Sequence, residues 1–368
     1  MRVAIVHDYL TQRGGAERVV LAMSRAFPDA PIYTSLYDPD GTFPEFRDLD
    51  VRTSVLQRIP GLARRHRLGL PLYAPVFSRM KVDADVVLCS SSGWAHGVRC
   101  DGPKVVYCYN PARWLYQADE YEGGGSWVGR VAIKPLRQVL VRWDRSAALS
   151  ADAYLTSSSI VAKRIQRSYG IEACLVPPPP ALLPGGRTTA VAGIEPGFVL
   201  CVSRLLPYKN VHRIVEAFQA LPKHRLVVLG DGPLRETLAA AAGDNVTLLQ
   251  NASDDELHWL YDNCLGLVAA SREDFGLTPL EAASFGKPSA VLRWGGFLDT
   301  MTDETAVFFE DPTPLEIARA IEALVTRQWD SAAIEQRAAL FDERHFADHV
   351  ARLVDSSTAD AVGLESAR

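Results

Sequence analysis

The chain has 368 residues, 48% of them hydrophobic, which is enough apolar material for two buried cores. Its formal net charge of -5 argues against nucleic acid as the main partner. No apolar stretch reaches the length of about eighteen residues that a membrane-spanning helix needs. The cysteines are scattered without a C-x-x-C pair, which indicates reduced thiols and a cytoplasmic location.

In the first half of the chain, apolar runs that read as buried strands alternate with helical patterns. The first run, residues 3–6, is followed by the turn Arg13-Gly14-Gly15 and then by apolar residues at helical spacing. Further strand-like runs cover residues 31–36, 86–90, 104–109 and 153–156. The alternation predicts a parallel sheet of the α/β class. The two glycines would let backbone approach a phosphate or a sugar, although a plain turn explains them equally well.

Two loops of this half follow strand-like runs, which is where ligands bind in open α/β sheets. They cover residues 90–96 and 107–116, and the first of them contains His96. A lone histidine is more often structural than catalytic, so position alone leaves its role open.

Residues 51–82 combine many cations with large apolar residues and contain no acidic residue. Such a composition is typical of a surface that meets anionic lipid. A solvated basic face above an ordinary core is the alternative.

A proline run followed by glycines and small polar residues covers residues 178–197 and cannot continue a helix or a central strand. We therefore predict a first domain over residues 1–177, this linker, and a second domain over residues 198–340, with a final helix and tail over residues 341–368. Strand-like runs of the second domain cover residues 198–202, 225–229, 246–249, 265–269 and 289–292.

Two cations, Arg204 and Lys209, come just before a helical pattern. Cations are unfavourable at a helix N-terminus, so an anion such as a diphosphate would explain them better than solvent exposure does. Gly230 follows the next strand, in a G-D-G-P turn where backbone could touch a ligand.

Glu273 and Glu281 flank an acidic, glycine-containing loop that follows an apolar run. The tetrapeptide of residues 278–281, T-P-L-E, has a capping residue, a proline and a glutamate at the spacing of a helix start, so capping by Thr278 is sufficient to explain Glu281. The same tetrapeptide recurs at residues 313–316. Only the upstream context, with Glu273 and the Phe275-Gly276 turn, distinguishes the first copy. The same reasoning predicts a capping box at Ser253.

Together these motifs resemble those of retaining glycosyltransferases of family GT4, and in particular bacterial polysaccharide mannosyltransferases. Glu273 and Glu281 resemble the E-x7-E motif of that family, and residues 203–210, S-R-L-L-P-Y-K-N, resemble its donor-phosphate motif. Residues 7–19, 91–98 and 109–116 resemble segments of the mannosyltransferase subgroup. The resemblance spans nearly the whole chain and implies an α/β GT-B fold, in which two Rossmann-like domains face each other across a cleft.

The resemblance also implies roles for individual residues. Arg204 and Lys209 would bind the donor diphosphate, and Glu273 would lie near the donor sugar. Further contacts to the donor would come from Gly15, Gly230, Phe275, Gly276, Leu277, Thr278 and Glu281. The acceptor would contact Gly14, Tyr109, Asn110 and Arg113. No metal and no other cofactor is expected, because the two cations replace a divalent ion.

The sequence departs from the subgroup at Tyr109-Asn110-Pro111, where relatives usually have H-T-P. A histidine often placed beside the donor sugar is therefore absent. His96 stands where many relatives carry lysine, and we expect it to take part of that catalytic role.

The resulting expectation is a retaining, metal-independent hexosyltransferase that moves mannose from GDP-mannose to a saccharide acceptor, preferably lipid-linked, in polysaccharide or glycolipid biosynthesis. It would be cytoplasmic or peripheral on the inner membrane face. The alternatives are a UDP-sugar donor with a small-molecule acceptor, and a non-enzymatic nucleotide-sugar-binding protein. A nicotinamide oxidoreductase is disfavoured because no G-x-G-x-x-G follows a strand.

Overall fold

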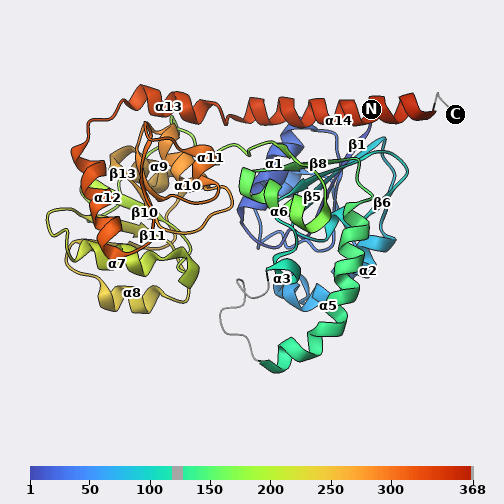
Figure 1. The fold of residues 1–368 in the computed structure, drawn as a ribbon, viewed down its shortest axis with the longest axis horizontal. Coiled ribbons are helices and arrows are strands. Elements are labelled where there is room, and N and C mark those ends of the chain that lie inside the picture. Colours follow the sequence, from blue (N-terminus) through green and yellow to red (C-terminus); the bar gives the residue numbers. More distant parts are fainter. Residues whose placement is uncertain (118–126, 366–368) are drawn as a thin grey trace. The chain divides into compact units, whose positions relative to one another are not determined.

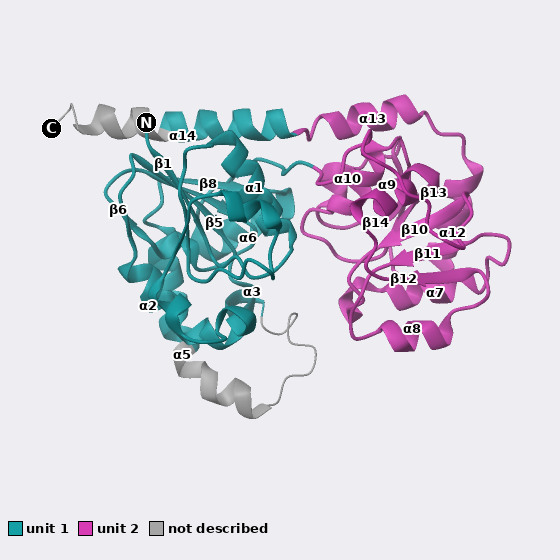
Figure 2. Cartoon of the chain, turned by 180° about the vertical axis from the view of Figure 1, so that it is seen from behind, with its two compact units in different colours: residues 1–179, 343–368 teal, residues 180–342 magenta. Residues whose placement is uncertain are grey.

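The computed structural model describes residues 1–117 and 127–365 (Figure 1). The chain divides into two compact units (Figure 2). Unit 1 comprises residues 1–179 and 343–368, and unit 2 comprises residues 180–342. Each unit is a parallel sheet covered by helices, the mixed α/β architecture that the sequence predicts.

The sheet of unit 1 has the order β3-β2-β1-β5-β7-β8-β9, and every neighbouring pair is parallel. Its strands are β1 (Val3–His7), β2 (Ile32–Thr34), β3 (Val51–Thr53), β5 (Val86–Ser91), β7 (Lys104–Cys108), β8 (Ala153–Thr156) and β9 (Cys174–Leu175). The runs predicted at residues 3–6, 31–36, 86–90, 104–109 and 153–156 are confirmed as strands. The short edge strands β3 and β9 were not predicted, nor was the separate pair β4 (Lys81–Val82) and β6 (Arg99–Cys100).

The helices of unit 1 cover both faces of this sheet, which explains why its strands are apolar along their whole length. They are α1 (Gly15–Ala26), α2 (Leu70–Arg79), α3 (Arg113–Tyr116), α5 (Trp127–Ala148), α6 (Ser159–Tyr169) and α14 (Glu343–Glu365), with short 3-10 turns η1 (Pro44–Asp48), η2 (Val55–Arg58), η3 (Ala63–Gly69) and η4 (Ala95–Gly97). In β1, Ile5 faces the core formed with α1 and α14, whereas the next residue, Val6, faces the core formed with α2, α5 and α6.

Helix α14 follows unit 2 in the sequence but packs on unit 1, along α1 (Figures 1 and 2). Its residues Phe346, Val350 and Val354 are spaced by one helical turn and are buried. The Phe346 ring lies 5.9 Å from that of Tyr107 in the central strand β7. The last helix therefore completes a core that begins with the first strand.

The sheet of unit 2 has the order β12-β11-β10-β13-β14-β15, again with parallel neighbours. Its strands are β10 (Phe198–Val202), β11 (Leu226–Leu229), β12 (Val246–Leu249), β13 (Cys264–Ala269), β14 (Ser289–Leu292) and β15 (Ala306–Phe309). The first five confirm the predicted runs, and β15 was not predicted.

The helices of unit 2 are α7 (Val211–Phe218), α8 (Arg235–Ala241), α9 (Asp254–Asn263), α10 (Leu277–Ser284), α11 (Phe297–Thr300), α12 (Pro314–Thr326) and α13 (Ser331–Ala339), with the 3-10 turn η5 (Pro207–Lys209). The capping box predicted at Ser253 is confirmed, because the Ser253 side chain and the Glu256 side chain each bond the backbone of the other residue. Within residues 1–117 and 127–365, no helix combines the length and the apolar character needed to cross a bilayer.

Candidate functional site

The sheet of unit 2 has a point where the direction of its connections reverses. From β10 the chain proceeds to β11 and β12 on one side, and then to β13 on the other side. Loops that leave neighbouring parallel strands at such a reversal diverge and leave a crevice at the carboxyl ends of the strands. The loops after β10 and β13 contain four of the residues singled out in the sequence: Arg204, Lys209, Glu273 and Phe275.

Lys209 and Glu273 meet at this reversal, although they are far apart in the chain. The Lys209 ammonium pairs with the Glu273 carboxylate, which also accepts a hydrogen bond from the Ser271 hydroxyl. The two side chains are 13% and 25% exposed, so the pair is partly reachable from solvent. Asn210 holds the same two loops together, since its Nδ2 donates to the Ala270 carbonyl at 2.9 Å.

Arg204 belongs to the same loop as Lys209 and is exposed. Its guanidinium lies 3.1 Å from the Tyr208 hydroxyl, and the Lys209 ammonium lies 5.2 Å from the centre of the Tyr208 ring. Tyr208 therefore contacts both cations. A guanidinium with five N–H donors keeps capacity for an anion after one such bond.

Gly230, predicted to touch the donor, packs against the protein itself. A Cβ built on it would lie 1.9 Å from the Ser203 carbonyl oxygen. Gly232 likewise approaches the Leu205 carbonyl and has a φ of 152°. Close packing of the loops after β10 and β11 accounts for both glycines.

The turn of Phe275 and Gly276 forms the N-terminus of α10. Gly276 has a φ of 90°, and a Cβ there would run into the Phe297 ring at 2.5 Å. Phe275 is buried in the core, whereas Leu277 and Thr278 are half-buried at the start of the helix. The first N–H groups of a helix have no hydrogen-bond partner within the helix. This turn therefore presents backbone N–H groups in the same loop as Glu273, the partner of Lys209.

The prediction that Thr278 caps α10 and that capping explains Glu281 is wrong. The helix begins at Leu277 with Gly276 at its cap position, and no side chain caps it. Glu281 is 9% exposed and accepts a hydrogen bond from the Tyr261 hydroxyl at 2.9 Å.

The second copy of the tetrapeptide does form a cap. The Thr313 side chain accepts from the Glu316 backbone, and the Glu316 carboxylate accepts from the backbone of Glu310 and Asp311. Identical residues thus take different roles, because the positive-φ glycine moves the start of α10 to a position before the threonine.

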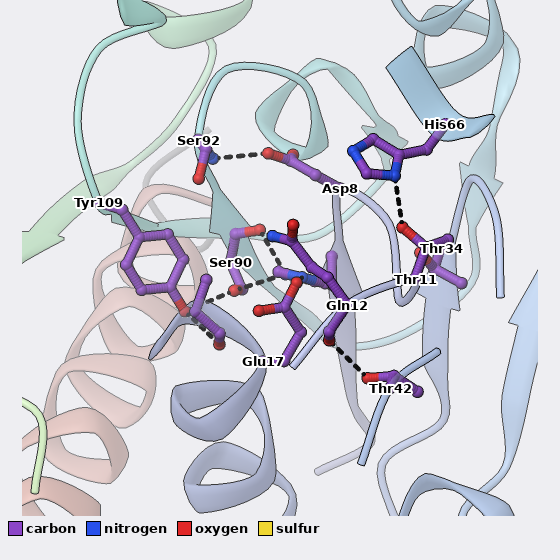
Figure 3. Close-up of polar contacts among 12 residues, drawn as sticks. Asp8, Thr11, Gln12, Glu17, Thr34, Thr42, His66, Ser90, Ser92 and Tyr109 are labelled. Carbon is purple, nitrogen blue, oxygen red and sulfur yellow. Dashed lines mark hydrogen bonds and ion pairs between the residues drawn. The ribbon is translucent and has the colours of Figure 1, made fainter. Parts of the chain in front are cut away.

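Unit 1 has a reversal of its own, between β1 and β5. Asp8, directly after β1, accepts a hydrogen bond from the backbone of Ser92 at 2.7 Å (Figure 3). It also accepts one from the backbone of Ala95 at 2.6 Å, so it joins the two loops. The carboxylate is buried, and burial raises the pKa of Asp8.

His96, predicted to be catalytic, lies inside unit 1. It is 2% exposed, its Nδ1 is 2.9 Å from the Ser91 hydroxyl, and its Nε2 is 3.1 Å from a carboxylate oxygen of Asp144. The ring also packs beside Trp143. Because both ring nitrogens face protein groups, this geometry favours a structural role for His96 over contact with a sugar.

The residues predicted to bind the acceptor are dispersed over three segments of unit 1. Gly14 is the cap residue of α1, and Gly15 beside it is exposed. The Tyr109 hydroxyl donates to the Ala16 carbonyl at 3.0 Å, and burial raises the pKa of Tyr109 well above its ordinary value. Tyr109 is therefore brought to the glycine turn. Asn110 is buried, and Arg113 begins α3 in a half-buried position.

Several residues at these sites were not found from the sequence. Tyr261 and Asp144 owe their positions to contacts between separate segments, which no local pattern reveals. Ser271 lies two residues before Glu273 and was not singled out. Glu17 had a visible signal, since it is a carboxylate in the first turn of a helix directly after two glycines.

Two family descriptions match consecutive parts of the chain. Residues 13–179 match Glycosyltransferase Family 4, and residues 191–341 match Glycosyl transferases group 1. The chain is a family GT4 glycosyltransferase. The family expected from the sequence motifs is thereby confirmed.

Curated relatives of this glycosyltransferase include mannosyltransferases at low identity. It is 24% identical over 364 residues to alpha-1,3/1,6-mannosyltransferase ALG2 of Homo sapiens, with 85% of this chain and 84% of the relative covered. It is 29% identical over 158 residues to a GDP-mannose-dependent alpha-(1-6)-phosphatidylinositol monomannoside mannosyltransferase of Mycolicibacterium smegmatis, with 38% of this chain and 40% of the relative covered.

Solved structures of similar fold cover almost all of this glycosyltransferase. Sucrose-phosphate synthase from Thermosynechococcus elongatus matches with a TM-score of 0.71 at 16% identity, over 98% of this chain and all of that chain (100%). The lipopolysaccharide outer core galactosyltransferase WaaB matches with a TM-score of 0.67 at 15% identity, over 97% of this chain and 99% of that chain. The GT-B fold predicted from the sequence is confirmed.

Proposed function

We propose that this glycosyltransferase moves a hexose from a nucleotide sugar to a saccharide acceptor with retention of configuration, and that GDP-mannose is its donor. The observation that carries the proposal is the Lys209–Glu273 pair at the sheet reversal of unit 2, with Arg204 exposed in the same loop. The names of the two curated relatives described above, both mannosyltransferases, support mannose as the sugar.

The two cations have the chemistry that departure of a nucleotide diphosphate requires. Negative charge grows on the diphosphate as the bond to the sugar breaks, and fixed cations beside it stabilise that charge without reorganisation. Glu273 holds Lys209 in place before the nucleotide sugar binds. Arg204 keeps N–H groups available to donate hydrogen bonds to the diphosphate. We infer that the diphosphate contacts both cations and the backbone N–H groups at the start of α10, while Glu273 faces the sugar.

Glu281 is the proposed contact to the ribose of the donor. A buried carboxylate that already accepts from Tyr261 has a fixed orientation. Ionised carboxylates accept several hydrogen bonds, so vicinal ribose hydroxyls are suitable partners. Glu281 does not take part in capping a helix, so capping does not explain why it is buried. Binding of the donor ribose would explain it.

We propose that the acceptor is lipid-linked and that residues 51–82 meet an anionic membrane surface. In this segment Leu56, Leu62, Tyr73 and Phe77 are buried, as an ordinary core would require. Five other large apolar side chains are exposed: Val55, Ile59, Leu68, Leu70 and Leu72 are 67%, 44%, 68%, 39% and 42% exposed.

Exposed arginines accompany these apolar side chains, namely Arg58, Arg64, Arg65, Arg67 and Arg79. Exposed cations beside exposed leucines are the combination that binds anionic headgroups and inserts into the acyl boundary. The core alternative explains only the buried half of the segment.

The donor is tested by a thermal-shift panel of GDP-mannose, UDP-glucose, UDP-galactose and NAD, followed by an assay of donor hydrolysis with and without a chelator. We expect stabilisation by GDP-mannose and slow release of GDP that a chelator does not stop. Stabilisation by a UDP-sugar and not by GDP-mannose would show that the donor is a UDP-sugar. Tight binding without any hydrolysis or transfer would show that the protein binds nucleotide sugars without being an enzyme. Loss of activity with the chelator would contradict metal independence.

A further inference from the structure

Glu17, in the first turn of α1, is a buried carboxylate that its surroundings leave incompletely satisfied. The residue is 1% exposed, and its Oε2 has no hydrogen-bond partner among the described residues. The ring of His7 lies nearby, with its Nε2 3.9 Å from Oε1. Burying a carboxylate oxygen without a hydrogen-bond donor costs free energy of folding. We therefore expect a bound ligand to provide the missing hydrogen-bond donor.

A chain of hydrogen bonds fixes the groups around Glu17 (Figure 3). The Tyr109 hydroxyl donates to the Ala16 carbonyl, so its oxygen accepts from the Ser90 hydroxyl at 2.8 Å. The Ser90 hydroxyl then accepts from His7 Nδ1 at 2.9 Å. His7 therefore carries a proton on Nδ1, and its Nε2 is the atom turned toward Glu17. The hydroxyl groups of Tyr109 and Ser90 and the Nδ1–H of His7 each already donate a hydrogen bond within this network. None of them is left to donate to Glu17 Oε2.

Gly14 leaves space beside this oxygen. Its φ of −132° is open to any residue, so backbone conformation does not demand a glycine. A Cβ at this position would, however, lie 2.6 Å from Glu17 Oε2. The adjacent Gly15 is exposed, so the turn next to the carboxylate reaches the surface. Two successive glycines allow such a turn to shift at small cost.

The charge of Glu17 selects what can occupy that space. A helix N-terminus by itself attracts phosphate, but here the carboxylate in the first turn already supplies the negative charge. A phosphate beside Glu17 would bring two anions together in a buried setting, whereas a neutral hydroxyl would donate the missing hydrogen bond.

We propose that Glu17 binds a hydroxyl of the acceptor sugar, which enters over Gly14. This assignment rests on the proposed transferase function. It makes a sugar, and not a phosphate, the ligand of the glycine turn. Glu17 is then an acceptor-binding residue that sequence motifs do not single out.

The test uses methyl α-mannoside and methyl α-glucoside as probes, with binding followed by saturation-transfer NMR on the full chain. Glu17→Gln removes the charge at nearly constant shape, and Glu45→Gln, an exposed glutamate in the first turn of η1, is the matched control. We expect one of the glycosides to bind the wild type and the control alike, and to bind Glu17→Gln about ten- to hundredfold more weakly, as for a lost hydrogen bond to a charged group. Inorganic phosphate should not displace it.

Equal binding to Glu17→Gln, displacement by phosphate, or no binding of either glycoside to the wild type would overturn the proposal. Should Glu17→Gln fail to fold, Gly14→Ala decides, because its methyl group takes the position beside Oε2 and keeps the charge of Glu17 in the protein. Weaker glycoside binding by Gly14→Ala supports the proposal, and unchanged binding overturns it. Because the readout is binding, it stands apart from donor hydrolysis, whose absence in the wild type would overturn only the transferase function.

Discussion

Glu281 shows how much a side chain's role depends on its neighbours beyond the local sequence. Its tetrapeptide recurs at residues 313–316, where threonine and glutamate form a helix cap in ordinary geometry. At the first copy, Gly276 takes the cap position, and Glu281 turns inward to Tyr261. Two identical tetrapeptides in one chain therefore provide a matched pair for experiment.

Glu281→Gln should weaken binding of the stabilising nucleotide sugar by about ten- to hundredfold, because a hydrogen bond to a charged group is worth roughly 1.5–3 kcal/mol. Glu316→Gln should leave that affinity unchanged and cost at most about 1 kcal/mol of stability as a weakened cap. Titration calorimetry and thermal melts of both variants provide the comparison. An equal, purely thermal effect in both would show that Glu281 is only structural.

Lys209→Met should lower the rate of donor turnover by about 10²–10³, as expected when one preorganised group that stabilises the leaving charge is removed. The pair with Glu273 is partly exposed, so the melting temperature should change little. Lys223→Met, an exposed lysine of the same unit, is the control. A turnover rate within twofold of the control would exclude Lys209 from catalysis.

At the scale of elements, the segment of residues 51–82 contains both buried and exposed apolar side chains. Its buried residues close one face of the sheet in unit 1, and its exposed residues on η2, η3 and α2 form an apolar surface among arginines. His66 anchors this segment to the loop after β1, since its ring stacks on Tyr9 at 4.5 Å and lies 3.0 Å from the Thr11 hydroxyl. The surface proposed to meet lipid is thus attached to the loop that leads to the glycine turn.

Leu68→Asp should weaken binding to vesicles of phosphatidylglycerol by about tenfold or more, because an inserted leucine contributes about 1.5 kcal/mol or more. Leu315→Asp places the same change on a leucine of unit 2 that is 61% exposed, close to the 68% of Leu68, and should have no effect. Co-sedimentation at low and high salt measures both. No binding of the wild type to anionic vesicles, or equal losses in the two variants, would contradict a membrane contact through this segment.

The sequence predicts elements well where an apolar run is long and buried on both faces, as in β1, β5 and β10. It does not reveal β3, where Val51 is followed by the polar Arg52 and Thr53, or β15, a short strand at the edge of the second sheet. At the sites, Arg204, Lys209 and Glu273 follow from motifs. Their juxtaposition does not, because it depends on β13 pairing with β10. The burial of His96 and Glu17 likewise depends on distant segments.

At the scale of the whole molecule, the chain passes between the two units twice, after residue 179 and after residue 342. Each unit has its own parallel sheet and its own cores, and unit 1 is assembled from both ends of the sequence. The ion pair between Arg25 of α1 and Glu343 of α14 joins those ends.

Phe346→Ala should destabilise unit 1 by about 3–5 kcal/mol, as for a buried aromatic side chain, and leave unit 2 unaffected. Hydrogen exchange resolved along the chain should show faster exchange in β1, β7 and α1 and unchanged exchange in β10 and β13. Leu340→Ala, at an exposed leucine, is the control and should stay within about 0.5 kcal/mol. Uniformly faster exchange in both units would mean that they unfold together.

The position of α14 has a consequence for synthesis on the ribosome. Unit 2 is complete once residue 342 has left the exit tunnel, whereas unit 1 must wait for Phe346, Val350 and Val354. At about 5–20 residues per second, the nascent first sheet exposes the side of its core that α14 later covers throughout the translation of unit 2. The half of the protein that is made first is therefore the half that finishes folding last, and its exposed strands are the natural target for a chaperone.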